Sequence, residues 1–377
     1  MIEKIVSKYN MSGKLINVEE NNSGNINNTY VATFQMEDST TKKYLIQKIN
    51  TTVFTEPYKL MKNIEGITSY LKKQLDKEGD VIHQVPEIIK TKDNKTLCYI
   101  EDNGERDYYR ISKYIENAVT YDYSTDPKIV YNTGVAFGNF QKMLRNYPMS
   151  KLSETIKDFH STDKRYKKLL EDIKIDSEGR VMEVAPEIVF IIMREDICSL
   201  ITEELGSDEV PYRVTHNDTK VNNVMMNKKT GDFVAVIDLD TVMPGSMLFD
   251  YGDGVRSTAS TAKEDEKDLS KVSLNLELFE AYTRGYLSEM APYITYEELS
   301  LMGESIRIIT LELAIRFLND YINGDTYFKT NYEKHNLDRA RNQLALVKDI
   351  ESKLDYINNF INDNYKKCKE KSRVLKK

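Results

Sequence analysis

The chain has 377 residues and is 40% hydrophobic, which is enough for two lobes with sizeable cores. Its formal net charge is −7, from 53 Lys and Arg against 60 Asp and Glu. Because a nucleic-acid binder needs a basic surface to displace the counterions of phosphates, this acidic balance argues against a nucleic-acid partner.

The opening third of the chain has the pattern of a strand-rich lobe. Its β-branched and aromatic runs are typical of strands, and one helix interrupts them at residues 58–77, where apolar residues recur at spacings of three and four. The predicted strands lie at residues 30–34, 44–49, 96–100 and 108–115.

A polar loop at residues 21–28 precedes the first predicted strand. Its small residues would let backbone N–H groups approach the oxygens of a phosphate. The loop matches neither common glycine-rich phosphate motif, and its composition fits a plain surface loop equally well. On the strand at residues 44–49, alternation puts Gln47 and Lys48 on opposite faces, and the pattern leaves open which of them faces a bound phosphate.

After residue 116 the pattern becomes largely helical. Pro127 fits the first turn of a helix, where its missing N–H is not needed. The change in pattern predicts one lobe of residues 1–116 and a second of residues 117–377. We expect helices at residues 127–145, 187–205, 271–290, 297–323 and 337–365, and a frayed, solvated tail from Lys366 onward.

A hairpin interrupts the helical pattern. Two short apolar runs, at residues 224–227 and 233–237, flank a turn that contains glycine. Pairing the strands outward from this turn puts Asn223 nearly opposite Asp238. Because hard oxygen ligands then meet at the open end, the hairpin predicts a Mg²⁺ site, for which one or two protein carboxylates suffice when phosphates complete the shell.

The loop before the hairpin carries an acid and a base. Asp218 can face an acceptor hydroxyl, and Lys220 can reach a phosphoryl group in transfer. Alone, either residue in a polar loop is more often structural. The whole pattern, His-x-Asp-x-x-x-x-Asn followed by a strand and an apolar residue before Asp, is that of a phosphoryl-transfer loop. His216 is expected to pack beneath the loop, and Asp240 is a candidate second-shell or second-metal group.

Further segments add to this pattern along most of the chain, at residues 24–30, 44–50, 216–223, 237–245, 249–253 and 316–320. With them the sequence resembles the aminoglycoside phosphotransferase/choline kinase family, and within it the bacterial N-acetylhexosamine 1-kinases. The His-x-Asp block is typical of the whole group. The Asp-Leu-Asp-Thr-Val-Met-Pro-Gly segment indicates the sugar kinases.

This resemblance implies an α+β, bilobal, protein-kinase-like fold with a small β-rich N-terminal lobe and a larger, mainly helical C-terminal lobe. It implies a kinase that uses ATP and Mg²⁺ to phosphorylate the anomeric hydroxyl of an N-acetylhexosamine (GlcNAc or GalNAc). Asp218 would be the base, Asn223 and Asp238 the metal ligands, and Arg316 and Tyr327 contacts to the sugar. The nucleotide would meet Gly24, Asn25, Asn27, Gln47, Lys48 and the lobe junction at Tyr114, Ile115 and Glu116.

Arg316 has two readings. It lies at the margin of a buried helical stripe that includes Ile315, and Glu312 four residues earlier could simply pair with it. Alternatively, the turn that follows the helix could return Tyr327 beside the guanidinium and form a polar wall with an aromatic platform. The charged segment that contains Asp250, Asp253 and Arg256 is expected to be a turn whose carboxylates satisfy backbone N–H groups.

Three other functions remain open on the sequence. A sister kinase for choline, an aminoglycoside or another sugar would differ in its acceptor pocket. A protein kinase fits less well, because Asn217 replaces the arginine usual in the loop, Asp-Leu-Asp at 238–240 replaces Asp-Phe-Gly, and no Ala-Pro-Glu follows. An inactive nucleotide-binding protein would not need Asp218, Asn223 and Asp238 together.

The cysteines, the first residues and the apolar runs bear on the cellular compartment of the protein. Cys98, Cys198 and Cys368 are far apart and odd in number, so a disulfide framework is not expected. The first residues lack the apolar core of a signal peptide, and the longest apolar run, at residues 188–193, is too short to cross a bilayer. We expect a cytoplasmic monomer or weak homodimer that acts on a small molecule and has no membrane partner.

Overall fold

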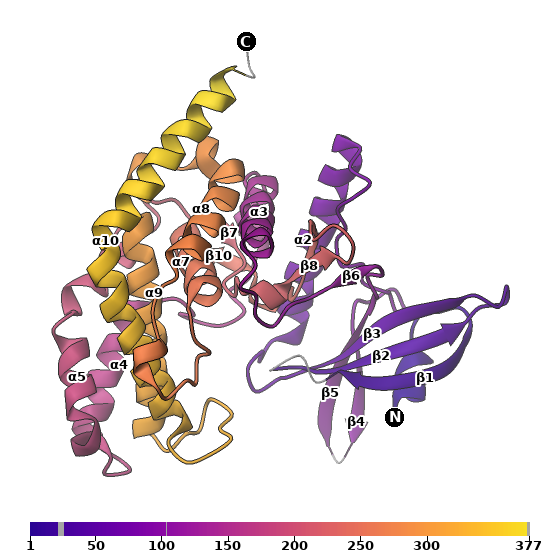
Figure 1. The fold of residues 1–377 in the computed structure, drawn as a ribbon. Coiled ribbons are helices and arrows are strands. Elements are labelled where there is room, and N and C mark those ends of the chain that lie inside the picture. Colours follow the sequence, from indigo (N-terminus) through magenta and orange to yellow (C-terminus); the bar gives the residue numbers. More distant parts are fainter. Residues whose placement is uncertain (22–25, 103, 375–377) are drawn as a thin grey trace.

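Five antiparallel strands form the sheet of the N-terminal lobe in the computed structural model, which describes residues 1–21, 26–102 and 104–374 (Figure 1). Their order is β1-β2-β3-β5-β4, so the chain leaves β3 and returns to pair with it as β5. The strands are β1 (Lys14–Asn21), β2 (Asn28–Gln35), β3 (Thr41–Ile49), β4 (Cys98–Asp102) and β5 (Glu105–Lys113), and the short helix α1 (Ile2–Val6) precedes them.

Alternation along β3 separates the core of this lobe from its open face. Tyr44 and Ile46 are buried in one apolar cluster with α1, whereas Leu45 and Gln47 point to the other side and line a cavity between the lobes. The sheet therefore offers polar side chains from its central strands to that cavity.

Helix α2 (Pro57–Glu78) ties the sheet to the rest of the molecule. Pro57 occupies its first turn and Gly79 ends it in the left-handed conformation, at φ 67°, so the helix lies within one residue of the prediction at each end. Its apolar stripe belongs to the same hydrophobic core as the C-terminal helices. This core crosses the lobe boundary expected at residue 116.

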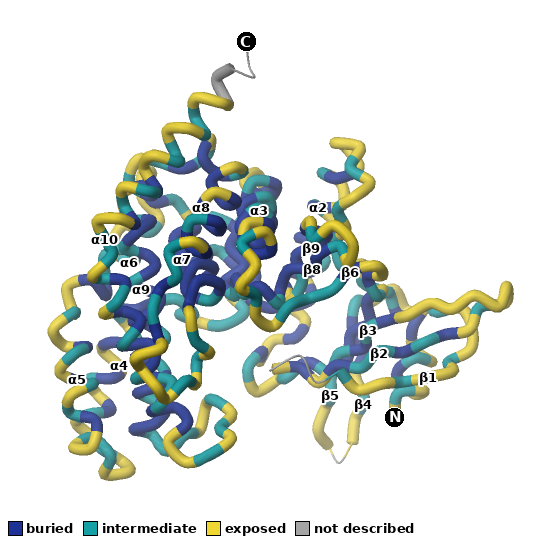
Figure 2. Tube along the Cα trace, in the orientation of Figure 1, coloured by how far each residue is buried: buried dark blue, intermediate teal, exposed yellow. Residues whose placement is uncertain are grey.

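Helices build the C-terminal lobe, and their inward faces are buried (Figures 1 and 2). In the described ranges, none of the helices combines the length and apolar composition that crossing a bilayer requires. They are α3 (Pro127–Leu144), α4 (Thr162–Ile175), α5 (Ala185–Ile192), α6 (Leu200–Glu204), α7 (Met247–Ala259), α8 (Leu276–Met290), α9 (Tyr296–Ile322) and α10 (His335–Val374). Short 3₁₀ turns are η1 (Met149–Lys151), η2 (Val181–Val184), η3 (Glu195–Ile197), η4 (Val221–Asn223), η5 (Leu239–Thr241), η6 (Leu269–Lys271) and η7 (Ala291–Tyr293).

Some helical expectations were wrong. The helix expected at residues 187–205 is broken into α5 and α6, α4 was not predicted, and the tail expected from Lys366 continues α10 to Val374. The charged turn expected near residue 252 is helix α7. Its glycines are required by packing, because a Cβ on Gly252 would lie 2.5 Å from the carbonyl oxygen of Ser305. This glycine-rich, charged segment therefore forms a helix in a setting where nearly all of its residues are buried, although glycine disfavours helices.

Two small sheets carry the loops between the lobes. One contains β6 (Ala118–Val119), β8 (Val224–Asn227) and β9 (Phe233–Val236), and the other pairs β7 (Arg213–Thr215) with β10 (Met243–Gly245). The β8–β9 hairpin is the predicted one. Val224 pairs with Val236, and the Ile237 N–H donates to the Asn223 carbonyl oxygen at 2.9 Å, so Asn223 lies nearly opposite Asp238 as predicted. Asp238 follows in the left-handed conformation, at φ 57°.

Candidate active site

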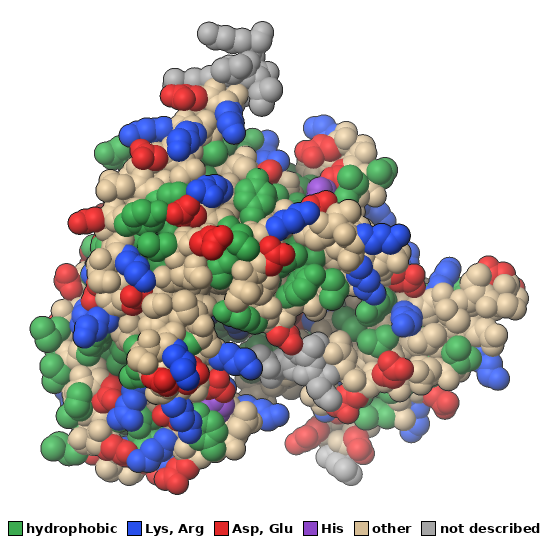
Figure 3. All heavy atoms as spheres, in the orientation of Figure 1, with side chains coloured by type: hydrophobic (Ala, Val, Ile, Leu, Met, Phe, Trp, Pro, Cys, Tyr) green, Lys and Arg blue, Asp and Glu red, His purple; other side chains and the backbone are tan. Residues whose placement is uncertain are grey.

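A cavity of about 460 Å³ lies between the lobes, and the space-filling view shows the surface hollowed where they meet (Figure 3). It collects residues from the sheet, the lobe junction, the loop after β7 and the hairpin. The residues expected at the site that line it are Asn27, Gln47, Tyr114, Ile115, Asp218, Lys220, Asn223, Asp238 and Asp240.

The loop after β7 presents Asp218 to this cavity. Its Oδ1 lies 2.9 Å from the Lys220 Nζ, and its Oδ2 accepts a hydrogen bond from the Asn223 Nδ2 at 2.9 Å. The charge of Asp218 raises the pKa of Lys220, which therefore stays protonated. The acid is held by two neighbours yet remains partly exposed to the cavity.

Helix α7 fixes the backbone of this loop. The Asp250 carboxylate accepts the N–H groups of His216 at 2.8 Å and Asn217 at 2.7 Å, and Asp253 accepts that of Thr219 at 3.0 Å. These bonds confirm that the carboxylates satisfy backbone N–H groups, although from a helix and not from a turn. The loop is therefore anchored on both sides of Asp218.

His216 lies beneath the loop as predicted. Its buried ring packs edge-on against Phe137 and Phe140, its Nε2 lies 2.9 Å from the Ile237 carbonyl oxygen, and its Nδ1 faces the Asp218 N–H at 3.3 Å. With these partners, Nε2 donates to the carbonyl oxygen and Nδ1 accepts the Asp218 N–H. His216 therefore supports the position of Asp218 and the end of the hairpin.

Oxygen atoms suited to a divalent cation meet at the end of the hairpin. Asn223 uses its Nδ2 to bond Asp218, which leaves its amide oxygen for another partner. The Asp238 carboxylate is open to the cavity but surrounded by protein on its other sides. This partial dehydration, then the negative charges of Asp240 and Asp218, raise the pKa of Asp238 to about 7. A cation there would offset this repulsion.

The donor set fits Mg²⁺ better than a metal that needs a full protein cage. No group of three or more His, Cys, Asp or Glu side chains in the described ranges is arranged to hold a metal ion. Mg²⁺ is commonly held by one or two carboxylates and completes its shell with phosphates and water. Asn223 and Asp238 are therefore the residues that would hold it.

Asp240 is already engaged through both carboxylate oxygens. It is 3% exposed, its Oδ1 pairs with the Arg110 Nη1, and its Oδ2 accepts the Asn27 Nδ2 at 2.5 Å. This arrangement favours a role in which Asp240 supports the segment that carries Asp238, over direct metal binding. The sequence reasoning missed Arg110. The one feature of the sequence that indicates a cation from elsewhere is Gln47, a glutamine at the strand position where a cation was expected.

The two candidates on β3 separate as alternation requires. Gln47 lines the cavity, and its Oε1 accepts a hydrogen bond from the Arg110 Nε at 2.9 Å. Lys48 lies on the other face and pairs with Asp107 at 2.7 Å, so the structure does not bring it into the site. Glu116 is exposed and does not line the cavity. Gly24 and Asn25 lie outside the described residues.

Arg316 and Tyr327 come together at the end of α9. The guanidinium lies 5.9 Å from the centre of the Tyr327 ring, 5.2 Å from that of Phe159 and 5.5 Å from that of Phe328. It forms no hydrogen bond or ion pair within the described ranges. The expected ion pair with Glu312 is not formed, although the charge of Arg316, after that of His160, acts against burial to lower the pKa of Glu312.

Glu312 binds His160 instead. The His160 Nδ1 lies 2.9 Å from the Glu312 Oε1, and its Nε2 lies 3.1 Å from the Asn217 carbonyl oxygen. Both ring nitrogens face acceptors, so the protonated ring satisfies both. His160, which was not predicted, joins the catalytic loop to the helix that carries Arg316.

Residues 18–293 match the phosphotransferase enzyme family (APH). The chain belongs to this family. It is a kinase that transfers phosphate to an alcohol group.

Solved structures with low sequence identity share the kinase's fold. A microcompartment-associated aminopropanol kinase has a TM-score of 0.64 at 14% identity, over 95% of this chain and 98% of that one. An aminoglycoside phosphotransferase from Alicyclobacillus acidocaldarius has 0.59 at 11%, over 94% and 97%. An amicoumacin kinase in complex with AMP-PNP and Ca²⁺ has 0.58 at 14%, over 93% and 92%. The predicted bilobal α+β fold is confirmed.

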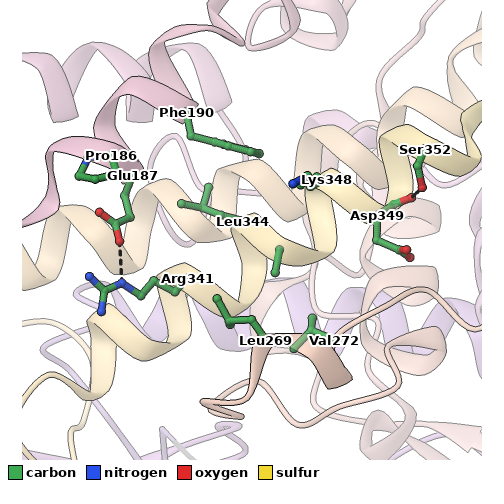
Figure 4. A pocket seen from close by; sticks show the side chains of 11 residues that line it. Pro186, Glu187, Phe190, Leu269, Val272, Arg341, Leu344, Lys348, Asp349 and Ser352 are labelled. Atoms are coloured by element: carbon green, nitrogen blue, oxygen red, sulfur yellow. Dashed lines mark hydrogen bonds and ion pairs between the residues drawn. The ribbon is translucent and has the colours of Figure 1, made fainter.

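The kinase has another cavity, of about 600 Å³, between α5, η6 and α10 (Figure 4). Phe190, Leu269 and Leu344 line it, and a pair between Glu187 and Arg341, with Nε and Oε1 2.6 Å apart, borders it. It contains none of the residues expected at the active site. The cavity between the lobes is therefore the candidate active site.

Proposed function

We propose that this kinase uses ATP and Mg²⁺ to phosphorylate the anomeric hydroxyl of an N-acetylhexosamine, giving the sugar 1-phosphate. The observation that carries the choice of acceptor is the guanidinium of Arg316, which is surrounded by aromatic rings and forms no ion pair in the described ranges. The alternative is a kinase for another small alcohol, such as choline, an aminoglycoside or a different sugar.

The lobe junction supports ATP as the donor. In the described part of the chain, no hydrogen bond engages the backbone of Ile115 or Glu116, whereas the flanking Tyr114 N–H donates to the Lys43 carbonyl oxygen at 3.1 Å. Free backbone donors and acceptors beside an apolar cavity wall suit the edge of an adenine ring. Among the similar structures, the amicoumacin kinase holds AMP-PNP and a spectinomycin phosphotransferase holds ADP.

The transfer is assigned to residues of the loop and the hairpin. Asp218 orients the acceptor hydroxyl and takes its proton, while Lys220, 2.9 Å from that carboxylate, donates to the phosphoryl group in transfer. Asn223 and Asp238 hold Mg²⁺, which when bound neutralises charge on the phosphates. Asp240 fixes the segment that carries Asp238 through its contacts with Arg110 and Asn27.

Positive charge at the acceptor wall supports a neutral, oxygen-rich acceptor. Arg165 on α4 lies close to Arg316, and burial followed by the charge of Arg316 lowers the pKa of Arg165. Two neighbouring guanidinium groups repel a quaternary ammonium or a polyamine. Hydroxyl and N-acetyl oxygens accept hydrogen bonds from guanidinium N–H groups, and a pyranose ring can stack on Tyr327.

A substrate panel tests this proposal. Purified protein with Mg-ATP is offered N-acetylglucosamine, N-acetylgalactosamine, glucose, galactose, choline, ethanolamine and an aminoglycoside, with ADP release as the readout. Phosphorus NMR then locates the phosphate on the best acceptor. We expect an N-acetylhexosamine to be preferred and to carry the phosphate on C1. Preference for a cationic acceptor would overturn the choice of sugar, and ADP release that is independent of any acceptor would overturn the kinase assignment.

A further inference from the structure

A buried ion pair joins the two lobes behind the proposed phosphate site. Arg110 lies on β5 of the N-terminal lobe and Asp240 follows β9 in the C-terminal lobe, and their side chains are 6% and 3% exposed. Burying two charges is unfavourable unless further hydrogen bonds satisfy them. Here those bonds come from residues of the candidate nucleotide site.

The second oxygen of Asp240 connects the pair to the chain segment before β2. The Asn27 Nδ2 donates to the Asp240 Oδ2 at 2.5 Å, and the Asn27 Oδ1 accepts the Asn50 N–H at 2.9 Å. The buried Asp240 carboxylate thus contacts β5 through Arg110 and the residue before β2 through Asn27. Asn27 in turn connects it to Asn50, the residue after β3. Asp238 lies two residues before that carboxylate, so the same contacts fix the segment that carries it.

Arg110 also supplies a cation to the cavity, which β3 lines with Leu45 and Gln47 and not with a lysine. Gln47 on β3 and Arg110 on β5 are cross-strand partners, and the Arg110 Nε donates to the Gln47 Oε1 at 2.9 Å. The Arg110 side chain lines the cavity, and its Nη2 forms no hydrogen bond within the described residues. A cation from the neighbouring strand therefore stands one strand away from the usual position of the kinase lysine.

We propose that Arg110 is the positioning residue for the nucleotide phosphates in this kinase, in place of a lysine on β3. It fixes Asp240, and with it the segment that carries Asp238, and it presents its Nη2 to the phosphate oxygens. This inference rests on the proposed use of ATP. Arg110 and Lys220 both line the cavity with Asp218, Asp238 and Asp240, so loss of Arg110 leaves a triphosphate facing these carboxylates with one cation fewer.

The test moves the cation across the strand pair. We compare Arg110→Gln with the double variant Gln47→Lys/Arg110→Gln, and use Arg106→Gln as the matched control, because Arg106 is an exposed arginine on the same strand, paired with Glu101. For Arg110→Gln we expect the KM for ATP and the Kd of a fluorescent ADP analogue to rise about tenfold or more, which corresponds to one charge-assisted hydrogen bond. The KM for the acceptor should stay within about twofold.

In the double variant, lysine at position 47 should recover at least half of the lost ADP-analogue affinity on a logarithmic scale. Unchanged ATP and ADP-analogue constants in Arg110→Gln, an equal loss for ATP and acceptor, or a double variant no better than the single one would overturn the proposal. If circular dichroism shows Arg110→Gln to be unfolded, Arg110→Lys replaces it, with the same selective rise in the ATP constants expected. The ADP analogue binds without an acceptor, so a wrong choice of sugar leaves this test intact.

Discussion

Two buried charge pairs flank the catalytic loop, one toward the nucleotide side and one toward the acceptor side. Arg110 and Asp240 join the sheet to the segment after the hairpin. His160 and Glu312 join the loop to helix α9, because His160 also contacts the Asn217 carbonyl oxygen at 3.1 Å. Each pair links Asp218 and its neighbours to a different part of the molecule.

The difference between the pairs is the chemistry of the cation. An arginine keeps its charge at any physiological pH, so the nucleotide-side pair does not respond to pH. A histidine titrates near neutrality. Burial alone would lower the pKa of His160, but the charge and hydrogen bond of Glu312 raise it above its ordinary value. Of the two buried pairs, only the pair of His160 and Glu312 is therefore built to respond to pH.

The largest effect on activity should come from changing Asp218, which lies between the nucleotide side and the acceptor side. Asp218→Asn removes the carboxylate that is proposed to take the acceptor proton, and we expect kcat to fall about 10²- to 10⁴-fold. The Kd of an ADP analogue should stay within about twofold, because neither side is disturbed. Steady-state kinetics and fluorescence titration measure the two quantities. Asp232→Asn, in the exposed hairpin turn, is the control, and a fully active Asp218→Asn enzyme would remove the assigned base.

The next effect separates metal binding from acceptor binding. Asp238→Asn weakens the proposed Mg²⁺ site. Even outer-shell partners of metals contribute 10- to 100-fold to affinity, so we expect the Mg²⁺ concentration for half-maximal rate to rise at least about tenfold. The KM for the acceptor should not change. A Mg²⁺ titration at saturating ATP measures the shift, and an unaltered Mg²⁺ dependence would rule out Asp238 as a ligand.

Partners that lie close along the chain could be predicted from the sequence. The hairpin, and the placement of Asn223 and Asp238 at its open end, follow from a local turn and two short runs. Arg316 and Tyr327 meet because a single turn after α9 returns the chain. In each case the residues that must meet lie within about one supersecondary unit.

Partners that come from distant segments could not be predicted from the sequence. Arg110 reaches Asp240 across 130 residues, and only the pairing of β3 with β5 places it beside Gln47. His160 meets Glu312 across 152 residues. Alternation separated Gln47 from Lys48, but only the position of the C-terminal lobe decides which face of the sheet is the cleft. These are long-range packing facts that no local pattern contains.

A smaller effect should distinguish the acceptor wall from the nucleotide side. Arg316→Ala removes the guanidinium between Phe159 and Tyr327, and we expect the KM for the sugar to rise about tenfold, as for one hydrogen bond from a charged group. The KM for ATP should remain unchanged, the reverse of the result expected for Arg110→Gln. Arg284→Ala, an exposed arginine on α8 paired with Glu280, is the control. A parallel rise in both constants would contradict the division into two sides.

The smallest effect, and the one specific to histidine, is on stability as a function of pH. Because the folded pKa of His160 is raised, the pair stabilises the protein fully below the unfolded pKa of about 6.5, and this contribution is lost as pH rises through the folded pKa. His160→Gln should lose about 1–3 kcal/mol of unfolding free energy near pH 6, measured by thermal unfolding as a Tm lowered by on the order of a few degrees.

The Tm difference between wild type and His160→Gln should shrink as pH is raised, since the wild-type histidine then loses its charge. Thr162→Val removes the other bond to Glu312, from the Thr162 Oγ1 at 2.7 Å, without removing a titratable group. Its Tm deficit should therefore stay nearly constant with pH. A constant deficit for His160→Gln as well would mean that His160 acts as a neutral packing residue, and the acceptor side would then be as insensitive to pH as the Arg110 pair.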